Sequence, residues 1–358
     1  MSKEICKRLI KDGHSVVIAS RYEVGSPRVD DGILVLPGQD AGVIKQVSDD
    51  DKVDYVFYCF NENQSRFNVF KNWVACSAID YEFVPPGIIE GTKGSKFQFC
   101  VSRHNQKEFE RVGFKPYYAP WGVDTNLFKP SLELRKKRRE RMGWKEDTFV
   151  IGTVGQNLPN DRKNHVNLLK AFMLFSKSHD DVALYMHTSA FASYPLANMA
   201  TAMGIADKVY FFDQKVYHLC ALPYDKMPEI YNGLDVMCIP AKGESFCLPF
   251  LEGQSCGVPL ITTDTTSGPE LMKGGWLIPV DDDDYEYLMF GSWQVVVRPS
   301  KIAEQLENAY QAWKNHTLEI TYGTKARLGA LEYDWDLVYE KYWKPFLKDL
   351  EEAKNGKV

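Results

Sequence analysis

This sequence of 358 residues lacks three features that would place it in other classes of protein. No apolar run approaches the ~20 residues that a membrane-spanning helix needs, and the stretch MSKEICKRLIKDGHSVVIAS lacks a signal-peptide pattern. The eight cysteines include no Cys-x-x-Cys pair, so the sequence predicts neither a zinc site nor a disulfide framework. We therefore expect buried free thiols in a cytoplasmic protein.

An excess of positive charge is also missing. The net charge of −5 gives no reason to expect nucleic acid as a partner. The acidic runs at 48–51 and 281–284 have no histidine nearby, so we interpret them as solvated turns and predict no metal site. One basic run, RKKRRER at 135–141, leaves two interpretations open. It is a solvated interdomain helix, or it makes a peripheral contact with anionic membrane lipid.

Strand-like apolar runs are present in two series, separated by amphipathic helical stretches. The first series lies at 15–20, 32–38, 53–60, 97–102 and 115–123. The second lies at 149–155, 182–189, 208–213, 235–241, 259–263 and 275–280. Alternation of strands and helices is typical of parallel sheets with helices on both faces. The sequence therefore predicts an α/β protein with two doubly wound domains.

Between the two series lies a charged segment without strand character, which we predict to be the linker. The N-terminal domain is expected at 1–125, the linker at 126–145 and the C-terminal domain at 146–335. The remaining residues, 336–358, carry a long amphipathic helical pattern interrupted at Pro345. Because its aromatic face is too apolar for solvent, we expect this helix to pack back onto the N-terminal domain.

The stretch AKGESFCLPFLEGQSCGVPLITT places two carboxylates around the predicted start of a short helix. Pro249 suits the first helical position and Gly257 suits the stop. Glu244 then precedes the helix and Glu252 lies one turn inside it. The N–H groups of 245–248 would form a site for phosphate or sugar oxygens, with the carboxylates accepting from paired hydroxyls. In the alternative interpretation, Glu252 only complements the helix dipole and Glu244 is solvated.

The same stretch, extended to GESFCLPFLEGQSCGVPLITTDTTSGPEL, resembles the Glu-x7-Glu signature of the family 4 retaining glycosyltransferases, which have the GT-B fold. IGTVGQNLPNDRKNHVNLLKAF resembles the first strand and donor phosphate loop of the family's C-terminal domain, and IYNGLDVMCIPA resembles the lead into the signature. In the N-terminal half, DGHSVVIAS, VDYVFYCF, FCVSRHNQKEFERVGF and WGVDTNLFKP match the order of the family's blocks. The resemblance implies two Rossmann-like domains facing a central cleft.

The resemblance also implies roles for individual residues. Glu244 would contact hydroxyls of the donor hexose, and Glu252 would accept from the donor ribose. Lys163, with Arg162 beside it, would neutralise the diphosphate leaving group, so neither a metal nor a cofactor besides the nucleotide sugar is expected. Other donor-binding groups would come from Gly155, Gln156, Ser245, Phe246, Cys247 and Leu248.

The sequence departs from the family pattern at several positions. The family usually has glycine at the positions of Ser245 and Cys247, and arginine at the position of Gln156. The family's opening strand and glycine-rich loop have no counterpart, so we expect an N-terminal domain without its first strand. The stretch IDYEFVPPGIIE, where many relatives have a catalytic histidine, offers Asp80 and Glu82 instead.

The resemblance implies a retaining, metal-independent hexosyltransferase. Its donor would be a UDP- or GDP-hexose, and its acceptor a hydroxyl on a glycan, lipid or small molecule. A lipid-linked acceptor would suit membrane contact through 135–141. Two alternatives stay open: a nucleotide-sugar epimerase or hydrolase of the same fold, and a catalytically degenerate nucleotide-sugar binding protein.

Overall fold

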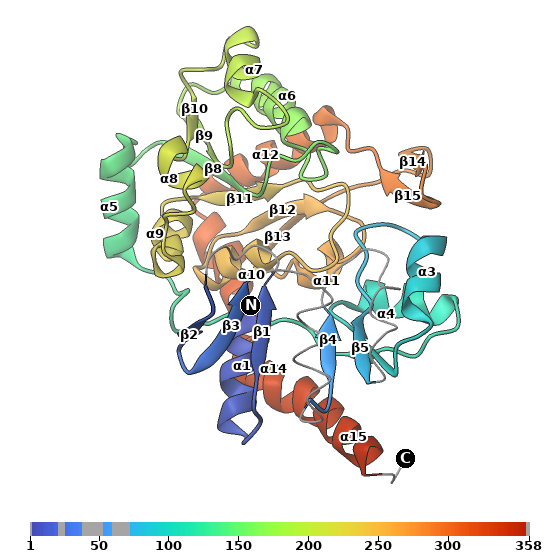
Figure 1. The fold of residues 1–358 in the computed structure, drawn as a ribbon. Coiled ribbons are helices and arrows are strands. Elements are labelled where there is room, and N and C mark those ends of the chain that lie inside the picture. The colour runs from blue at the N-terminus through green and yellow to red at the C-terminus, as the bar shows by residue number, and fades with distance from the viewer. Residues whose placement is uncertain (1, 21–25, 38–52, 59–71, 356–358) are drawn as a thin grey trace.

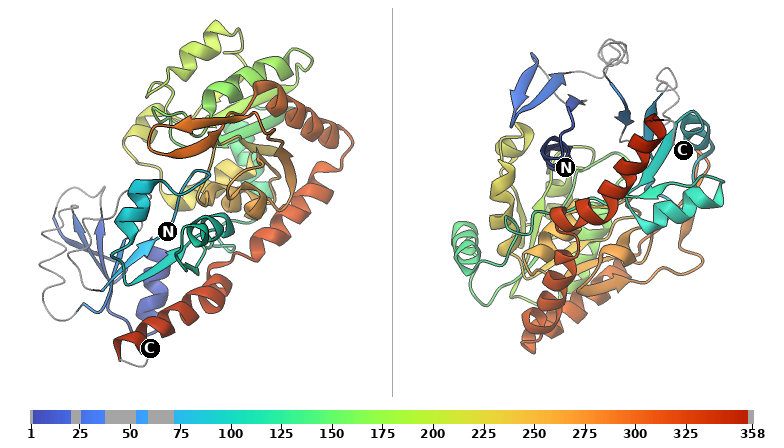
Figure 2. Two further views of the ribbon diagram at one scale, coloured as in Figure 1. Left: turned by 90° about the vertical axis from the view of Figure 1, so that its right-hand side faces the viewer. Right: turned by 90° about the horizontal axis from the view of Figure 1, so that it is seen from below.

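The computed structural model describes residues 2–20, 26–37, 53–58 and 72–355 (Figure 1). The predicted acidic turn at 48–51 and part of the predicted strand at 53–60 lie outside these residues. The described chain forms two sheet-containing halves, and the last helices run beneath both of them (Figure 2).

The C-terminal half is built on one six-stranded parallel sheet. Its strands are β8 (Phe149–Val154), β9 (Val182–His187), β10 (Val209–Phe211), β11 (Val236–Ile239), β12 (Leu260–Thr263) and β13 (Gly275–Ile278). Their spatial order is β10-β9-β8-β11-β12-β13, and every neighbouring pair is parallel. This is the doubly wound order of a Rossmann domain. All six strands of the second predicted series are confirmed.

Side chains alternate between the two faces of this sheet, which explains why both faces carry helices. In β8, Phe149 and Ile151 belong to one buried cluster, together with α6 (His165–Ser176) and α12 (Pro299–Lys314). Val150 belongs to the other cluster, together with α9 (Met227–Asn232) and α10 (Leu248–Ser255). Strands buried on both faces need continuous apolar runs, and these runs made the strands predictable.

Two smaller sheets form the N-terminal half. The first contains β1 (Val17–Ser20), β2 (Arg28–Asp30) and β3 (Ile33–Pro37), which follow α1 (Ser2–Lys11). The second is parallel and contains β4 (Val56–Tyr58), β5 (Trp73–Cys76), β6 (Phe97–Cys100) and β7 (Tyr117–Tyr118). The helices α3 (Pro86–Thr92) and α4 (Arg103–Arg111) accompany the second sheet. The predicted strand at 115–123 is reduced to two residues, and β2 and β5 were not predicted.

The hairpin of β14 (Tyr285–Leu288) and β15 (Ser292–Val295) was also missed by the sequence analysis. Its turn contains Gly291, whose φ of +88° favours glycine. Trp293 pairs through its backbone with Glu82 of the N-terminal half. The hairpin therefore joins the C-terminal half to the loop that follows β5.

The predicted linker contains a helix, α5 (Leu132–Met142), which packs on α9. The Ser131 hydroxyl accepts from Leu134 N at its start, and Gly143 ends it in the left-handed conformation. Most basic side chains of 135–141 are engaged with the body of the C-terminal half. Arg135 and Arg139 pair with Asp235, Lys137 and Arg141 pair with Glu229, and Arg138 lies over the ring of Tyr185.

These ion pairs attach α5 to the protein, so they reduce the charge that the run could offer to a lipid surface. Contact with a membrane through 135–141 stays a prediction. Within the described part of the chain, none of the helices has the length and apolar character needed to cross a bilayer.

The C-terminal segment crosses from one half to the other as α14 (Trp335–Val338), a π-helical turn (Tyr339–Trp343) and α15 (Lys344–Lys354). The turn immediately precedes Pro345, where the sequence indicates an interruption. Phe346 packs against Tyr117, with ring centroids 4.7 Å apart, and the hydroxyl of Tyr55 donates to the carbonyl of Leu350 at 2.6 Å. The domain boundaries at 125 and 145 themselves stay a prediction.

Candidate active site

The candidate site lies where the chain reverses its direction of winding across the six-stranded sheet. This switch falls between β8 and β11, because the strands continue outward from them on opposite sides. Ligands of open α/β sheets bind beyond the carboxyl ends of the strands at such a point. The β8–α6 loop carries Lys163 and the β11–α10 loop carries Glu244, so the fold brings these two predicted residues together.

Glu244 is the centre of a buried ion cluster. One of its carboxylate oxygens, Oε1, lies 2.6 Å from Lys163 Nζ and 2.8 Å from Arg162 Nη1. Glu244 is 5% exposed and Lys163 is 9% exposed. Burial acts to raise the pKa of Glu244, but the two cations outweigh it and the pKa lies below its usual value. Burial acts to lower the pKa of Lys163, but the Glu244 carboxylate opposes this and the pKa lies above its usual value.

The start of α10 presents backbone donors beside this cluster. Pro249 lies in its first turn, as predicted. Among the residues that the structure describes, no hydrogen-bond partner is found for the N–H groups of Phe246, Cys247 and Leu248. Such groups at a helix start are suited to an anion. The N–H of Ser245, by contrast, already has an acceptor in Asp80.

The backbone conformation of Cys247 explains why the family usually has glycine at this position. Its φ is +64°, in the left-handed region where a side chain costs roughly 1 kcal/mol or more. Its sulfur lies 3.5 Å from Lys163 Nζ, and burial raises its thiol pKa to about 12, so it is a neutral neighbour of the lysine.

The remaining predicted residues of the β8–α6 loop differ in exposure. Gly155 packs against the stem of Lys163, because a Cβ at this position would lie 2.9 Å from the lysine Cγ. Gln156 is exposed. The structure thus brings Gly155, Arg162 and Lys163 to the Glu244 cluster and leaves Gln156 at the surface.

Glu252 lies one turn inside α10, in different surroundings from Glu244. Its two oxygens accept from the hydroxyls of Tyr231 at 2.6 Å and Tyr224 at 2.7 Å. Burial raises its pKa above the usual value, and the tyrosine hydroxyls only partly oppose this. Tyr224 is half-exposed, so a ligand hydroxyl can reach this carboxylate by displacing it. The two carboxylates of the predicted signature therefore differ in electrostatic character.

Replacing Glu252 by glutamine is expected to raise the stability of the ligand-free protein at neutral pH. Because the folded-state pKa is raised, the folded protein binds the proton more tightly than the unfolded chain does. Stability is therefore lost as pH rises through this range, by about 1.4 kcal/mol for each tenfold difference in proton affinity between the two states. Thermal unfolding at pH 7.5 and pH 4 tests this, since the gain should be present at the higher pH and vanish at the lower. A gain of equal size at both pH values would contradict it.

Asp80 joins this site from the N-terminal half, although it was not among the predicted site residues. Its Oδ1 accepts from Ser245 N at 2.7 Å, and its Oδ2 lies 3.5 Å from Arg162 Nε. The backbone approach is also tight: a Cβ at Gly243 would lie 2.1 Å from the Asp80 carbonyl oxygen. Burial raises the pKa of Asp80, with Arg162 only partly opposing it. Its place in the stretch where many relatives have a catalytic histidine, shortly after the missed strand β5, was the available signal.

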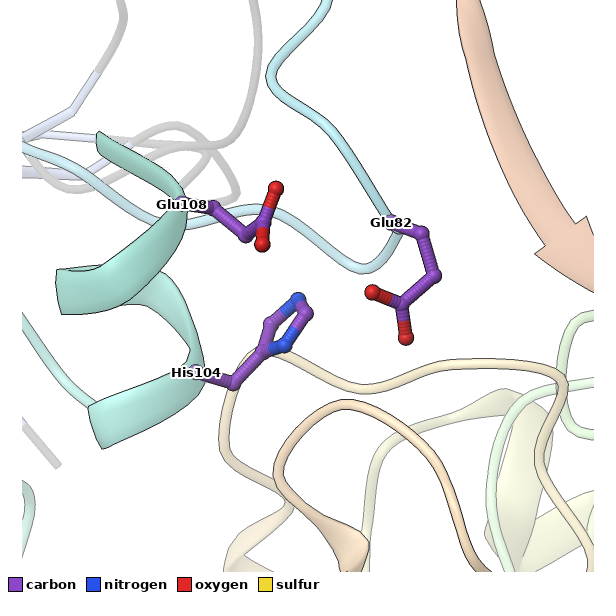
Figure 3. A group of neighbouring side chains, drawn as sticks. All are labelled: Glu82, His104 and Glu108. Carbon is purple, nitrogen blue, oxygen red and sulfur yellow. The ribbon is translucent and has the colours of Figure 1, made fainter. Parts of the chain in front are cut away.

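A group of three side chains holds the loop that carries Asp80 (Figure 3). Glu82, His104 and Glu108 converge there, with one ligand-type atom from each lying within 4.8 Å of the others. Each has a partner within the chain: His104 Nε2 lies 2.9 Å from Tyr81 O, Glu108 accepts from Phe83 N at 3.0 Å, and Glu82 accepts from the Thr265 hydroxyl at 2.9 Å. Three consecutive residues after Asp80 are thus fixed, which positions its carboxylate.

A second cluster, in the 281–284 run, is neutralised by cations. The prediction of a solvated turn fits Asp281 and Asp283, which are exposed. It is wrong for Asp284. Asp284 is buried and pairs with Lys301 and Arg298, each at 2.6 Å. The prediction that the protein needs no metal stays a prediction.

Comparison with known proteins shows which protein family the segment containing this site resembles. Residues 135–288, which contain Lys163, Glu244 and Glu252, match the family model of the group 1 glycosyl transferases. A GDP-mannose-dependent phosphatidylinositol monomannoside mannosyltransferase of Mycolicibacterium smegmatis is 27% identical over 186 residues, which are 49% of this chain and 46% of that protein. A D-inositol 3-phosphate glycosyltransferase of Geodermatophilus obscurus is 32% identical over 150 residues, which are 40% of this chain and 31% of that protein. The chain thus spans less than half the length of these relatives.

Solved structures show the fold. Sucrose-phosphate synthase from Thermosynechococcus elongatus superimposes with a TM-score of 0.72 at 13% identity, covering 96% of this chain and 91% of that one. HepE from Anabaena, in complex with UDP-glucose, gives a TM-score of 0.68 at 16% identity, covering 88% and 86%. The predicted GT-B fold is confirmed. The similarity to group 1 glycosyltransferases supports the resemblance, and membership of the retaining family 4 stays a prediction.

Proposed function

We propose that this chain is a retaining, metal-independent glycosyltransferase that moves a hexose from a UDP- or GDP-linked donor to a hydroxyl acceptor. The observation that carries the proposal is the buried cluster of Lys163, Arg162 and Glu244 beside the start of α10. Two cations and a set of backbone donors at the switch point suit a diphosphate. A carboxylate held ionised next to them suits the hydroxyls of the attached sugar.

The chemistry follows from this placement. Lys163 and Arg162 stabilise the negative charge that develops on the diphosphate as its bond to the anomeric carbon breaks. The N–H groups of 246–248 bind the distal phosphate, and Glu244 orients the hexose. The acceptor oxygen bonds to the anomeric carbon on the same face, and its proton passes to the departing phosphate oxygen. No group in this sequence is assigned as a covalent nucleophile.

The comparisons support a nucleotide-sugar donor without distinguishing its base. One relative is named for its dependence on GDP-mannose, and one structure with the same fold contains UDP-glucose. The acceptor is a glycan, a lipid or a small molecule, and the site of action is the cytoplasm. Glu252 would accept from the donor ribose in place of Tyr224.

One observation favours a second candidate, a nucleotide-sugar binding protein without turnover. Gln156 is neutral and exposed where the resemblance implies an arginine, so the phosphate loop has one cation fewer. In this alternative, donors bind but neither transfer nor hydrolysis follows.

A thermal-shift screen against UDP, GDP and their common hexose conjugates tests donor binding. A ligand at 100 times its Kd is expected to stabilise the folded state by about 2.7 kcal/mol. Turnover of the donor that binds, with the product anomer assigned by NMR, then separates the transferase from the binding protein. Retention and full activity in EDTA are expected. Inversion, or dependence on a divalent cation, would contradict the proposed mechanism.

A further inference from the structure

Two carboxylates of this chain already pair with the cations of the candidate site, and one of them comes from the other half of the protein. Glu244 lies against Lys163 and Arg162, and Asp80 lies against Arg162 and the N–H of Ser245. Two carboxylates thus balance two cations. A diphosphate that entered this cluster without displacing a carboxylate would meet no net positive charge.

Glu244 and Asp80 differ in how firmly each is held in this cluster. Glu244 belongs to the same loop as the binding groups, and its backbone is anchored there: its N–H donates to the Thr266 hydroxyl at 2.9 Å, and its carbonyl accepts from Ser267 N at 3.3 Å. Asp80 belongs to a loop of the N-terminal half, whose residue Glu82 also pairs with Trp293 of β15. Displacement of this loop would remove Asp80 from the cluster and leave Glu244 in place.

The packing between the two halves is tight beside these groups. The backbone of Asp80 packs directly on Gly243, with no room for a Cβ. Release of Asp80 from the cluster therefore requires this contact to open.

We propose that Asp80 is an intramolecular competitor for the anionic group of the donor, seated on Arg162 and Ser245 N–H until the donor displaces it. Its carboxylate oxygens stand in for phosphate oxygens, so donor binding is coupled to release of the loop that carries Asp80. The inference rests on the proposed function in one respect, that these cations receive the donor diphosphate. It deepens that function by assigning a device that regulates access to the same site.

Asp80→Asn is the appropriate test because asparagine keeps an acceptor for Ser245 N–H but removes the competing charge. Calorimetric titration with inorganic pyrophosphate is expected to show at least about fivefold tighter binding to this variant than to the unaltered chain, the lower end of typical coupling between sites. Unchanged or weaker binding by a variant that unfolds at the normal temperature overturns the proposal.

Glu270→Gln is the matched control. Glu270, in α11 (Gly268–Leu271), also joins the halves, since it accepts from Arg103 N and from the Tyr118 hydroxyl at 2.6 Å each, but it does not touch the cations. It should leave pyrophosphate binding within twofold of the original. If it tightens binding as much as Asp80→Asn does, loosening of the interface is the cause and competition by charge is refuted.

These measurements distinguish failure of this inference from failure of the proposed function. Tighter pyrophosphate binding by Asp80→Asn supports the competitor even if no sugar is transferred. Equal binding by all three proteins, accompanied by measurable transfer, overturns the competitor and leaves the transferase standing. Absence of pyrophosphate binding in every protein overturns the competitor and the assignment of these cations to the diphosphate, and the thermal-shift screen with nucleotide sugars then decides the transferase.

Discussion

Lys163→Met is expected to lower kcat/KM for the donor by about 10²–10³-fold, the usual cost of losing a preorganised group that stabilises charge in the transition state. The lysine is buried, but the Glu244 carboxylate opposes the effect of burial and its pKa is raised, so it carries a full charge at neutral pH. Methionine keeps most of the volume but cannot neutralise a diphosphate. Steady-state kinetics with the donor found by the thermal-shift screen measures the effect.

The folded state should survive this change, because Glu244 keeps Arg162 as its partner at 2.8 Å. Lys170→Met is the matched control, since Lys170 is an exposed lysine on α6, the helix that follows the phosphate loop. It removes the same charge a short distance from the site and should leave kcat/KM within twofold. If both variants lose activity equally, the contribution of Lys163 is one of net charge and its assignment as a leaving-group contact is wrong.

Glu244→Gln is expected to cost about 3–5 kcal/mol of folding stability in addition to activity, the range found when one partner of a buried ion pair is removed. Arg162 retains Asp80 nearby. Lys163 is left buried at 9% exposure, with a neutral thiol and a neutral amide as neighbours. Urea unfolding at pH 7 measures the loss.

The double variant Lys163→Met/Glu244→Gln distinguishes the electrostatic cause from a packing defect. It should recover most of the lost stability, because no unpaired lysine remains, and yet it should stay inactive. Losses in stability that simply add would show that the two residues act independently. Recovery of activity in the double variant would exclude both residues from the reaction.

The pH dependence of Glu244 runs opposite to that of Glu252. The folded-state pKa of Glu244 is lowered, so its stabilising ion pairs are present above the unfolded-state pKa and are lost as pH falls through the folded value. Both carboxylates come from one short stretch of sequence. Their pKa values move in opposite directions because one faces cations from another loop and the other faces two tyrosine hydroxyls.

Local pattern was sufficient for the six-stranded sheet of the C-terminal half. Strands buried on both faces leave continuous apolar runs, and α10 carries its own start and stop signals in Pro249 and Gly257. The same half resembles known glycosyltransferases over residues 135–288. The missed strands β2, β14 and β15 read RVD, YEYL and SWQV, in which polar residues interrupt the apolar ones. The fourth, β5, is an apolar run of only four residues, WVAC, and such a run does not by itself distinguish a strand from a buried helix segment.

The sequence by itself thus determined the doubly wound sheet, the helix that begins between the two glutamates and the loop that carries Lys163. Only the tertiary structure decided which groups surround them. Asp80 reaches Ser245 across 165 positions of the chain, and the basic run 135–141 finds its carboxylates nearly a hundred residues away. The physical reason is that periodicity specifies which face of an element is buried, whereas the partner of a buried charge depends on how the two halves dock.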